Sequence, residues 1–517
     1  MLLKAPLSDT IDAMKFVCCL VLVAAILGPP AAMASCESLS ALALPDSKIT
    51  LAQAVAAGEF TLPGAAPAAA RQYKDLPAFC RVAATLKPTS DSDIKIEVWL
   101  PASGWNGKFQ AVGNGGWAGS ISYPAMGQAL RRGYATASTD TGHTGGSASF
   151  ALGHREKLID FGYRAVHETT LKSKLVVAAF YGDPAKLSYW NGCSTGGRQA
   201  LKEAQQYPAD FDGIIAGAPA NFRTHLQVGQ IWTASATLKD PASYIPPAKY
   251  PLIHKAVLEA CDSLDGVKDG VIENPLRCHF DPKTIECKGE DTSACLTPPQ
   301  VEAARKIYAG ATNPRTGLRI WPGVMPGSEL GWAQTAGGPE PIGLAMEYFK
   351  YVVFEDPNWD WKTFNFDTDT ARTDKLEYGM NATDPNLKEF VGHGGKLLLY
   401  HGWSDPLISP QNSINYYRSV EDTMGGPART AGFARLFLVP GMGHCGGGEG
   451  PNSFDMVGAI EQWVEKSKAP EQIVASHLTG GAVDRTRPLC PYPLAAVWKG
   501  SASTDSASSF VCAADTH

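Results

Sequence analysis

The chain has 517 residues, with 45 Lys and Arg against 51 Asp and Glu, a formal net charge of -6, and a hydrophobic fraction of 44%. This apolar fraction excludes a disordered or collagen-like chain, and the absence of basic runs argues against nucleic acid as a partner, because binding phosphate needs clustered Lys and Arg. The length exceeds one ordinary domain, so we expect either two domains or one large core with an insertion.

The N-terminal segment has the pattern of a secretory signal peptide. An apolar run at 17–27 precedes a small-residue cleavage pattern at 32–34. The run is too short to span a bilayer as a helix. We therefore predict that residues 1–34 are a signal peptide and that the mature protein is secreted or periplasmic, without a transmembrane anchor. The alternatives are a buried N-terminal helix, a lipoprotein signal ending at Cys36, and a true start at Met14.

The cysteine count agrees with export. Two of the 12 cysteines lie in the predicted signal peptide, and an even number remains, which is typical of a disulfide framework in an exported chain. No CxxC pair is present, which disfavours a zinc ribbon. Spacing alone leaves many pairings open. Pairing of near neighbours suggests 36–80, 261–278, 287–295 and 490–512, which leaves Cys193 with Cys445.

Strands that alternate with helices indicate a mostly parallel α/β sheet. The periodicity predicts strands at 93–101, 108–112, 134–138, 186–190, 213–216, 395–400 and 434–439. It predicts helices at 166–181, 199–206, 412–420 and 456–466.

The alternation is lost between about 221 and 390. This segment contains four cysteines, many aromatic residues and several Pro/Gly clusters. We therefore predict a sheet domain formed by 35–220 and 391–517 and interrupted by an insertion at 221–390.

A Gly-x-Ser-x-Gly motif at 192–196 contains the candidate nucleophile, Ser194. A predicted strand precedes it and a predicted helix follows, which is the context that the motif requires. The flanking glycines suit a sharp turn that leaves no room for side chains. The alternative is a glycine-rich turn with an incidental serine.

A serine hydroxyl needs a neighbouring base, and the base needs an orienting acid. Asp405 and His444 follow the last two predicted strands, in the chain order serine, acid, histidine that α/β-hydrolases share. We predict that Ser194, Asp405 and His444 form a catalytic triad. His143 and His401 also lie near strand ends, and we expect them to support the triad or line the pocket.

The serine and the histidine each have an adjacent cysteine, Cys193 and Cys445. A disulfide between them would tie the turn of the nucleophile to the loop of the base and so hold the reacting groups in attack geometry. The alternative is two unrelated structural cysteines.

Together, Cys193-Ser194, Asp405 and His444-Cys445 resemble the CS-D-HC signature of the tannase and feruloyl esterase family, which includes the hydrolases of mono-hydroxyethyl terephthalate (MHET). The resemblance covers nearly all of the mature chain, including the Gly-Asn-Gly-Gly segment at 113–116 and the length of the insertion. It implies an α/β-hydrolase core, a lid domain after the sixth core strand, and five disulfides in the pairing given above. It also implies a small-molecule substrate, an ester of an aromatic acid, and no organic cofactor.

The oxyanion formed during acylation needs preorganised N–H donors. The position of Thr195 at the start of a helix predicts one donor. Gly115 or Gly116 would supply the other, since missing side chains let the backbone approach the substrate. The alternative for this glycine segment is an ordinary turn.

An acidic loop lies in the insertion between two cysteines. It resembles the calcium loop in the lid of this family, and calcium prefers several oxygen ligands. The predicted ligands are the carboxylates of Asp262, Asp265 and Asp269 and the main-chain carbonyls of Val267 and Val271. Such a Ca²⁺ site would be structural, and the alternative is a solvated acidic turn.

The most favoured function is a feruloyl esterase, with a tannase acting on galloyl esters as the second choice. A terephthalate monoester hydrolase is disfavoured, because Ile408 stands where the MHET hydrolase has an aromatic residue and no cation can be assigned to the free carboxylate. Other classes are an acyltransferase with the same triad, a catalytically silent binding protein, and a calcium-dependent carbohydrate-binding module. The sequence leaves the oligomeric state undetermined.

Overall fold

The structure is a computed structural model that describes residues 34–64 and 71–514. The predicted signal peptide lies outside the described residues, apart from Ala34. Within the described ranges, no helix is both long and apolar enough to cross a membrane.

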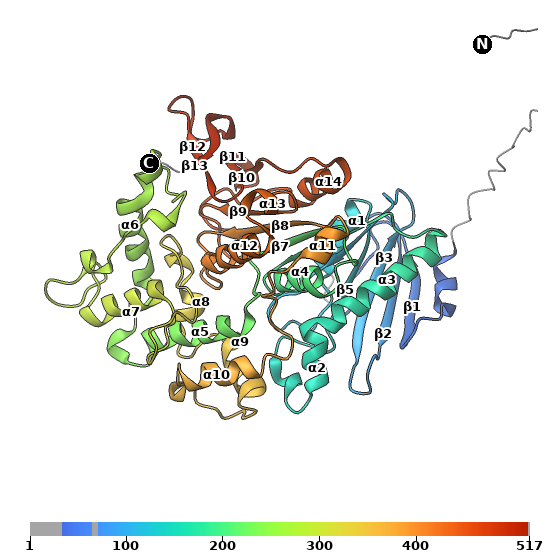
Figure 1. Cartoon of the computed structure of the whole chain (residues 1–517), viewed down its shortest axis with the longest axis horizontal. Helices are drawn as coiled ribbons and strands as arrows, with labels where there is room; N and C mark the ends of the chain where they lie inside the picture. The colour runs from blue at the N-terminus through green and yellow to red at the C-terminus, as the bar shows by residue number, and fades with distance from the viewer. Residues whose placement is uncertain (1–33, 65–70, 515–517) are drawn as a thin grey trace, which may run out of the picture.

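The core is a nine-stranded sheet with the order β1-β2-β3-β5-β4-β6-β7-β8-β9 (Figure 1). The pairs β1/β2, β2/β3 and β3/β5 are antiparallel, and all pairs from β5 onward are parallel. The strands are β1 (Ser47–Val55), β2 (Phe79–Leu86), β3 (Ile94–Pro101), β4 (Lys108–Val112), β5 (Ala135–Thr139), β6 (Leu187–Cys193), β7 (Gly213–Gly217), β8 (Lys396–Gly402) and β9 (Ala434–Val439). The predicted α/β class is confirmed.

Successive residues of the parallel strands alternate between two apolar clusters. On β8, Leu397 and Leu399 belong to one cluster and Leu398 to the other. The first cluster includes residues of α3 (Ala165–Tyr181), α4 (Thr195–Gln206) and α12 (Pro410–Met424), and the second includes residues of α1 (Tyr123–Arg131) and α14 (Met456–Lys466). Both faces of the parallel part are therefore buried, which explains why its strands are continuous apolar runs in the sequence.

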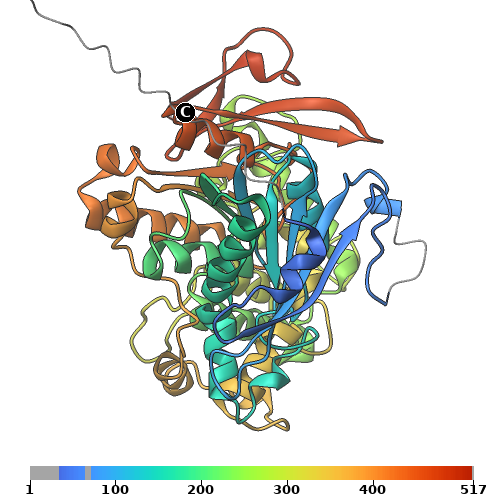
Figure 2. The same cartoon turned by 90° about the vertical axis from the view of Figure 1, so that its right-hand side faces the viewer.

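The structure corrects the predicted start of one helix and adds strands that the sequence pattern missed. The helix predicted at 199–206 begins at Thr195 in the structure. The sequence pattern predicts a later start because two adjacent glycines lower the helix propensity of the first turn. Strand β1 is half-buried at the sheet edge and lacks a clear alternation. Two further two-stranded sheets follow near the C-terminus, formed by β10 (Ile473–Thr479), β11 (Ala482–Leu489), β12 (Leu494–Trp498) and β13 (Phe510–Ala514); Figure 2 shows them in red at one end of the molecule.

The segment between β7 and β8 contains helices and no β-strand among its residues, all of which are described. Its helices are α5 (Arg223–Leu238), α6 (Tyr250–Cys261), α7 (Pro298–Ala309), α8 (Ala333–Ala336), α9 (Gly343–Glu347), α10 (Thr368–Lys375) and α11 (Lys388–Gly392). Most of them lie beside the sheet in Figure 1. Strand β7 is the seventh strand in chain order, and the expectation of a lid domain after the sixth core strand stays a prediction. The division of the chain at 220 and 390 stays a prediction.

Two apolar clusters hold this insertion together. One is formed within it around α6 and α7. The other joins it to the core, because Trp117 and Phe161 of the core pack with Leu226, Phe349 and other residues of the insertion. The insertion therefore shares buried surface with loops of the sheet domain.

All five suggested disulfides are present, namely Cys36–Cys80, Cys193–Cys445, Cys261–Cys278, Cys287–Cys295 and Cys490–Cys512. Five disulfides are consistent with a secreted protein. Since the thiol of Cys36 is bonded to Cys80, the structure does not support a lipid anchor at that residue.

Candidate active site

Ser194 lies at the sharp turn between β6 and α4. Its φ of 63° is in the left-handed region, which is strained for a residue with a side chain and occurs mainly at functional sites. The flanking glycines permit the turn: a Cβ at Gly192 would lie 2.6 Å from the carbonyl oxygen of Gly196, and one at Gly197 would lie 2.2 Å from that of Gly217. The strand-turn-helix context predicted for the motif is confirmed.

Asp405 and His444 meet at the ends of β8 and β9. Nδ1 of His444 lies 2.7 Å from Oδ2 of Asp405, whose side chain is fully buried. The other oxygen of Asp405 accepts bonds from the main-chain N–H groups of Leu407 and Ile408, at 2.8 and 3.0 Å. These contacts fix the carboxylate so that it can hold the imidazole in one tautomer.

The electrostatics of this pair follow from burial and contact. Burial alone would raise the pKa of Asp405, but the charge of His444 and a hydrogen bond from His401 hold it well below its usual range. Burial alone would lower the pKa of His444, whereas the charge of Asp405 and its hydrogen bond raise it above the ordinary value. Asp405 therefore stays ionised and stabilises a protonated His444.

The disulfide between Cys193 and Cys445 joins the turn of Ser194 directly to the loop of His444, with the two Cα atoms 6.0 Å apart. Ser194 and His444 are the immediate chain neighbours of the bonded cysteines. One covalent link therefore holds together two segments that are 252 residues apart in the chain.

His401 is fully buried beneath the acid. Its Nε2 lies 3.1 Å from Oδ2 of Asp405 and 2.9 Å from the carbonyl oxygen of Ile408, while its Nδ1 lies 2.7 Å from the hydroxyl of Ser413. His401 and His444 thus contact the same oxygen of Asp405.

His143 lies elsewhere, beside the glycine segment. Its Nε2 is 2.6 Å from the carbonyl oxygen of Trp117, and its ring stacks on Phe150 at 3.8 Å. Burial lowers the pKa of His143. His143 is therefore a neutral residue that packs behind this segment.

The glycine segment at 113–116 is docked on the first turn of α4. The N–H of Gly196 donates to the carbonyl of Asn114 at 2.8 Å. The side-chain oxygen of Gln199 accepts a bond of 3.0 Å from the backbone N–H of Asn114, and its side-chain nitrogen donates one of 3.0 Å to Oδ1 of Asn114. A Cβ at Gly113 would lie only 2.5 Å from the Cα of Gly196. The segment is therefore held firmly against the helix that follows Ser194.

The residues predicted to form the oxyanion hole lie at this junction. The hydroxyl of Thr195 donates to the carbonyl of Gly116 at 2.9 Å. Among the residues that the structure describes, none places a heavy atom within 4 Å of a Cβ at Gly115, whereas a Cβ at Gly116 would lie 3.1 Å from the side chain of Leu344 in the insertion. Open space beside Gly115 leaves room for a substrate to approach the backbone.

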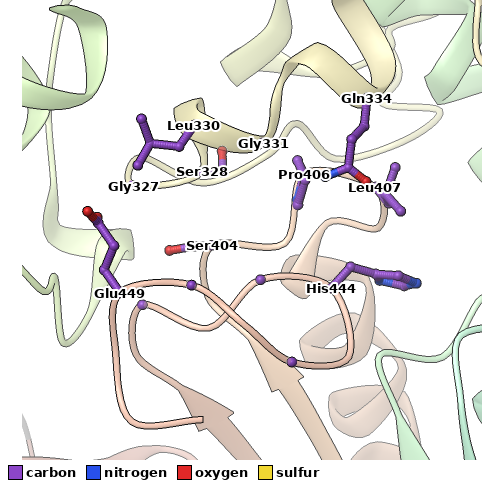
Figure 3. Close-up of a pocket in the computed structure, with 14 residues that line it drawn as sticks. Gly327, Ser328, Leu330, Gly331, Gln334, Ser404, Pro406, Leu407, His444 and Glu449 are labelled. Carbon is purple, nitrogen blue, oxygen red and sulfur yellow. The ribbon is translucent and has the colours of Figure 1, made fainter. Parts of the chain in front are cut away.

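A cavity of about 350 Å³ lies between the insertion and the loops that contain Asp405 and His444. Leu330 and Gln334 line it from the insertion, and Ser404, Leu407 and His444 line it from the core. Figure 3 shows the imidazole of His444 at one side of this cavity. A molecule bound in this cavity would contact both parts of the chain; Ser194 is not among the residues that line it.

An ion-paired histidine connects the insertion to the loop of the base. Nδ1 of His254, on α6, lies 2.8 Å from Glu329, and its Nε2 lies 2.7 Å from Glu449, which follows His444 in the same loop. Burial alone would lower the pKa of His254, but its hydrogen bonds to the two carboxylates raise it to about 9. Sequence reasoning missed this contact, because the partners lie 75 and 195 residues away.

This histidine is expected to make stability depend on pH. Its pKa rises from about 6.5 in the unfolded chain to about 9 in the folded protein. Its contribution is therefore fully present below pH 6.5 and is lost as the pH rises through about 9. Melting curves between pH 6 and 10 should show a decline that His254→Gln removes. His154→Gln, at an exposed histidine paired with Asp91, should leave the decline unchanged; parallel curves for wild type and His254→Gln would refute the assignment.

The carboxylates of the acidic loop accept hydrogen bonds from main-chain N–H groups of the same loop. Asp262 accepts bonds from the N–H groups of Asp269 and Gly270 at 3.1–3.2 Å, and Asp265 accepts one from Val267 at 2.9 Å. Oδ2 of Asp269 forms an ion pair with Arg487.

The donor set of this loop consists only of oxygen atoms, which fits calcium. In the described part of the chain, one trio of potential ligand side chains has ligand atoms within 4.8 Å of one another, and it lies elsewhere, at His167, Glu203 and Asp210. A calcium ion in the acidic loop would therefore also need the main-chain carbonyls of Val267 and Val271.

Comparison with known proteins identifies relatives along nearly the whole chain. The profile of the family described as "Tannase and feruloyl esterase" matches residues 80–513. An uncharacterized esterase of Xanthomonas campestris is 41% identical, over 95% of this chain and 93% of its own. A probable feruloyl esterase B-1 of Aspergillus terreus is 35% identical, over 89% of this chain and 91% of its own. The crystal structure of feruloyl esterase B from Aspergillus oryzae superposes with a TM-score of 0.86 at 31% identity, covering 92% of this chain and 99% of that structure.

Proposed function

The chain belongs to the tannase and feruloyl esterase family, and from this premise we propose that it hydrolyses esters of phenolic acids, feruloyl esters first, with Ser194, His444 and Asp405 as its triad. That it is a carboxylic ester hydrolase follows from relatives at 35–41% identity over most of the chain. The observation that carries the triad is the 2.7 Å contact between His444 and Asp405 beside a disulfide that reaches the turn of Ser194.

In the proposed mechanism His444 removes the proton of the Ser194 hydroxyl, which attacks the ester carbonyl. Asp405 keeps the Nδ1 proton of His444 in place and stabilises the imidazolium. The N–H of Thr195 and that of Gly115 or Gly116 would stabilise the oxyanion. His444 then protonates the leaving alcohol, and water, activated by the same histidine, hydrolyses the acyl-enzyme.

The substrate is tested by initial rates of the purified mature protein on methyl ferulate, methyl gallate and MHET. The proposal expects the highest kcat/KM on methyl ferulate. Preference for methyl gallate would indicate a tannase, and preference for MHET would indicate the terephthalate branch. Hydrolysis of none of the three by a folded protein would favour an acyltransferase or a binding role on the same scaffold.

We also propose that the acidic loop binds a structural calcium ion and that residues 1–34 direct export. The calcium ion would be held by Asp262, Asp265 and Asp269 with the carbonyls of Val267 and Val271. It would supply positive charge to a loop that carries three carboxylates, and it would take no part in ester hydrolysis.

Removal of divalent cations is expected to lower the melting temperature of the wild type. EDTA followed by added Ca²⁺ should lower and then restore Tm, because a ligand that binds only the folded state stabilises it. Asp265→Asn should start near the lower Tm and respond little to EDTA. A wild type that melts identically with and without chelator would leave the loop as a solvated acidic turn.

A further inference from the structure

One face of helix α5, in the insertion, carries buried polar groups that lack hydrogen-bond partners among the described residues. Arg223, Gln227 and Gln230 are spaced by four and three residues, so they lie on the same side of the helix. Nε and Nη2 of Arg223, both amide atoms of Gln227 and Oε1 of Gln230 are buried without a hydrogen bond. The hydroxyl of Tyr348, in the same insertion, is also buried and unpartnered.

The segment that leads into this face contacts the turn of Ser194. The N–H of Ala220, three residues before Arg223, donates to the carbonyl of Ser194 at 3.1 Å. The guanidinium carbon of Arg223 lies 4.5 Å from the ring centroid of Trp117. Trp117 follows Gly116, whose carbonyl accepts a hydrogen bond from the hydroxyl of Thr195.

The other end of the face reaches the loop of the catalytic acid. Nε2 of Gln230 lies 3.5 Å from the carbonyl oxygen of Leu407, and the N–H of Leu407 donates to Asp405. Gln230 also borders a cavity of about 20 Å³, which has room for one water molecule. The unpartnered groups that need another explanation are therefore those of Arg223, Gln227 and Tyr348.

Of these groups, the charged guanidinium of Arg223 costs the most free energy when it is buried without a hydrogen-bond partner. Burial lowers its pKa to about 10, so it remains a cation at neutral pH, and no carboxylate in the described residues forms an ion pair with it. A second buried cation, Arg198, lies near enough for the two charges to repel, but its guanidinium donates to three main-chain carbonyls. Buried polar groups are nearly always bonded, so an acceptor from outside the chain would complete the surroundings of Arg223.

We propose that Arg223, with Gln227 and Tyr348 beside it, binds an oxygen substituent on the aromatic ring of the substrate's acyl group. The inference rests on the proposed esterase function and adds a residue that selects the substrate. The shared chemistry is an oxygen acceptor on the ring, either a phenolic oxygen or a carboxylate. An unsubstituted ring would leave the guanidinium unpaired, and a site built for a polar group discriminates strongly against an analogue that lacks it.

Entry of the ring requires Arg223 to move, since it is only 2% exposed. Its long side chain can rotate away from Trp117, so that the ring of the substrate stacks on the indole in place of the guanidinium. The guanidinium then stays within reach of the ring's substituent.

The test compares Arg223→Met with wild type on methyl ferulate, MHET and methyl cinnamate, whose ring has no oxygen. We expect kcat/KM to fall at least about tenfold on a ring-oxygenated ester and less than about twofold on methyl cinnamate. The larger loss on methyl ferulate would identify a phenolic oxygen, and on MHET a carboxylate. Arg372→Met, which removes an exposed lid arginine stacked 4.8 Å from Phe354, should change none of these rates.

Two further readouts separate this inference from a purely structural role and from failure of the proposed function. Arg223→Met should not lower Tm, because methionine replaces an unpaired buried charge. Calorimetry with Ser194→Ala should show that ferulate or terephthalate binds more tightly than cinnamate, and that adding Arg223→Met removes the difference. Equal losses of kcat/KM on all three esters, together with a lowered Tm, would overturn the inference. Equal affinities for the three acids would also overturn it, and this binding result does not depend on whether the wild type hydrolyses the esters.

Discussion

Replacing Ser194 with alanine is expected to lower kcat on the preferred ester about a millionfold while leaving the fold intact. Without the hydroxyl there is no nucleophile for acylation, and only the oxyanion donors and substrate binding would remain to assist attack by water. Relief of the positive φ is not expected, because alanine has the same backbone restriction as serine at that position. Initial rates with near-identical circular dichroism and Tm for the two proteins would measure this effect.

The matched control is Ser47→Ala, at a half-buried serine that begins β1. Its rates should equal those of the wild type. Turnover by Ser194→Ala at even a few per cent of the wild-type rate would show that another residue is the nucleophile.

Replacing Cys193 and Cys445 together with alanine is expected to reduce both stability and catalysis. The disulfide closes a segment of 252 residues, and loss of such a bond costs on the order of 2–5 kcal/mol. Because the same bond positions the turn of Ser194 against the loop of His444, a displacement of about 1 Å would cost about 100-fold in kcat. Urea denaturation and steady-state kinetics of the double variant measure the two effects.

The disulfide between Cys287 and Cys295 is the control for this double variant, because it closes a short loop within the insertion. The double alanine variant at that pair should lose stability without a comparable loss of kcat. If both double variants keep wild-type kinetics, the link between Cys193 and Cys445 is structural only.

The parallel part of the sheet could be predicted from the sequence because each strand is buried on both faces and is therefore a short apolar run between turn residues. Strand β1 could not, since at the sheet edge none of its residues is buried. The sequence pattern predicts a start of α4 that is later than the observed one, for a different reason. Gly196 and Gly197 are poor helix formers, and only the close approach of neighbouring backbone explains their presence there.

The triad residues could be proposed from sequence because each lies in a local motif at a strand end. The contacts of His254 and Arg223 could not, because their surroundings come from distant segments of the insertion and the core. A lone histidine or arginine on a helix gives no signal of a partner 195 residues away. In this chain, local sequence therefore predicts the reacting groups better than it predicts the surface that selects a substrate.

The most direct test of the triad is labelling of the purified protein with a serine-reactive fluorophosphonate, followed by peptide mass spectrometry and residual ester hydrolysis. The account predicts one label, on Ser194, with hydrolysis of methyl ferulate lost in proportion to labelling, and little labelling of His444→Ala. A label on a different residue, or hydrolysis that survives complete labelling of Ser194, would contradict it.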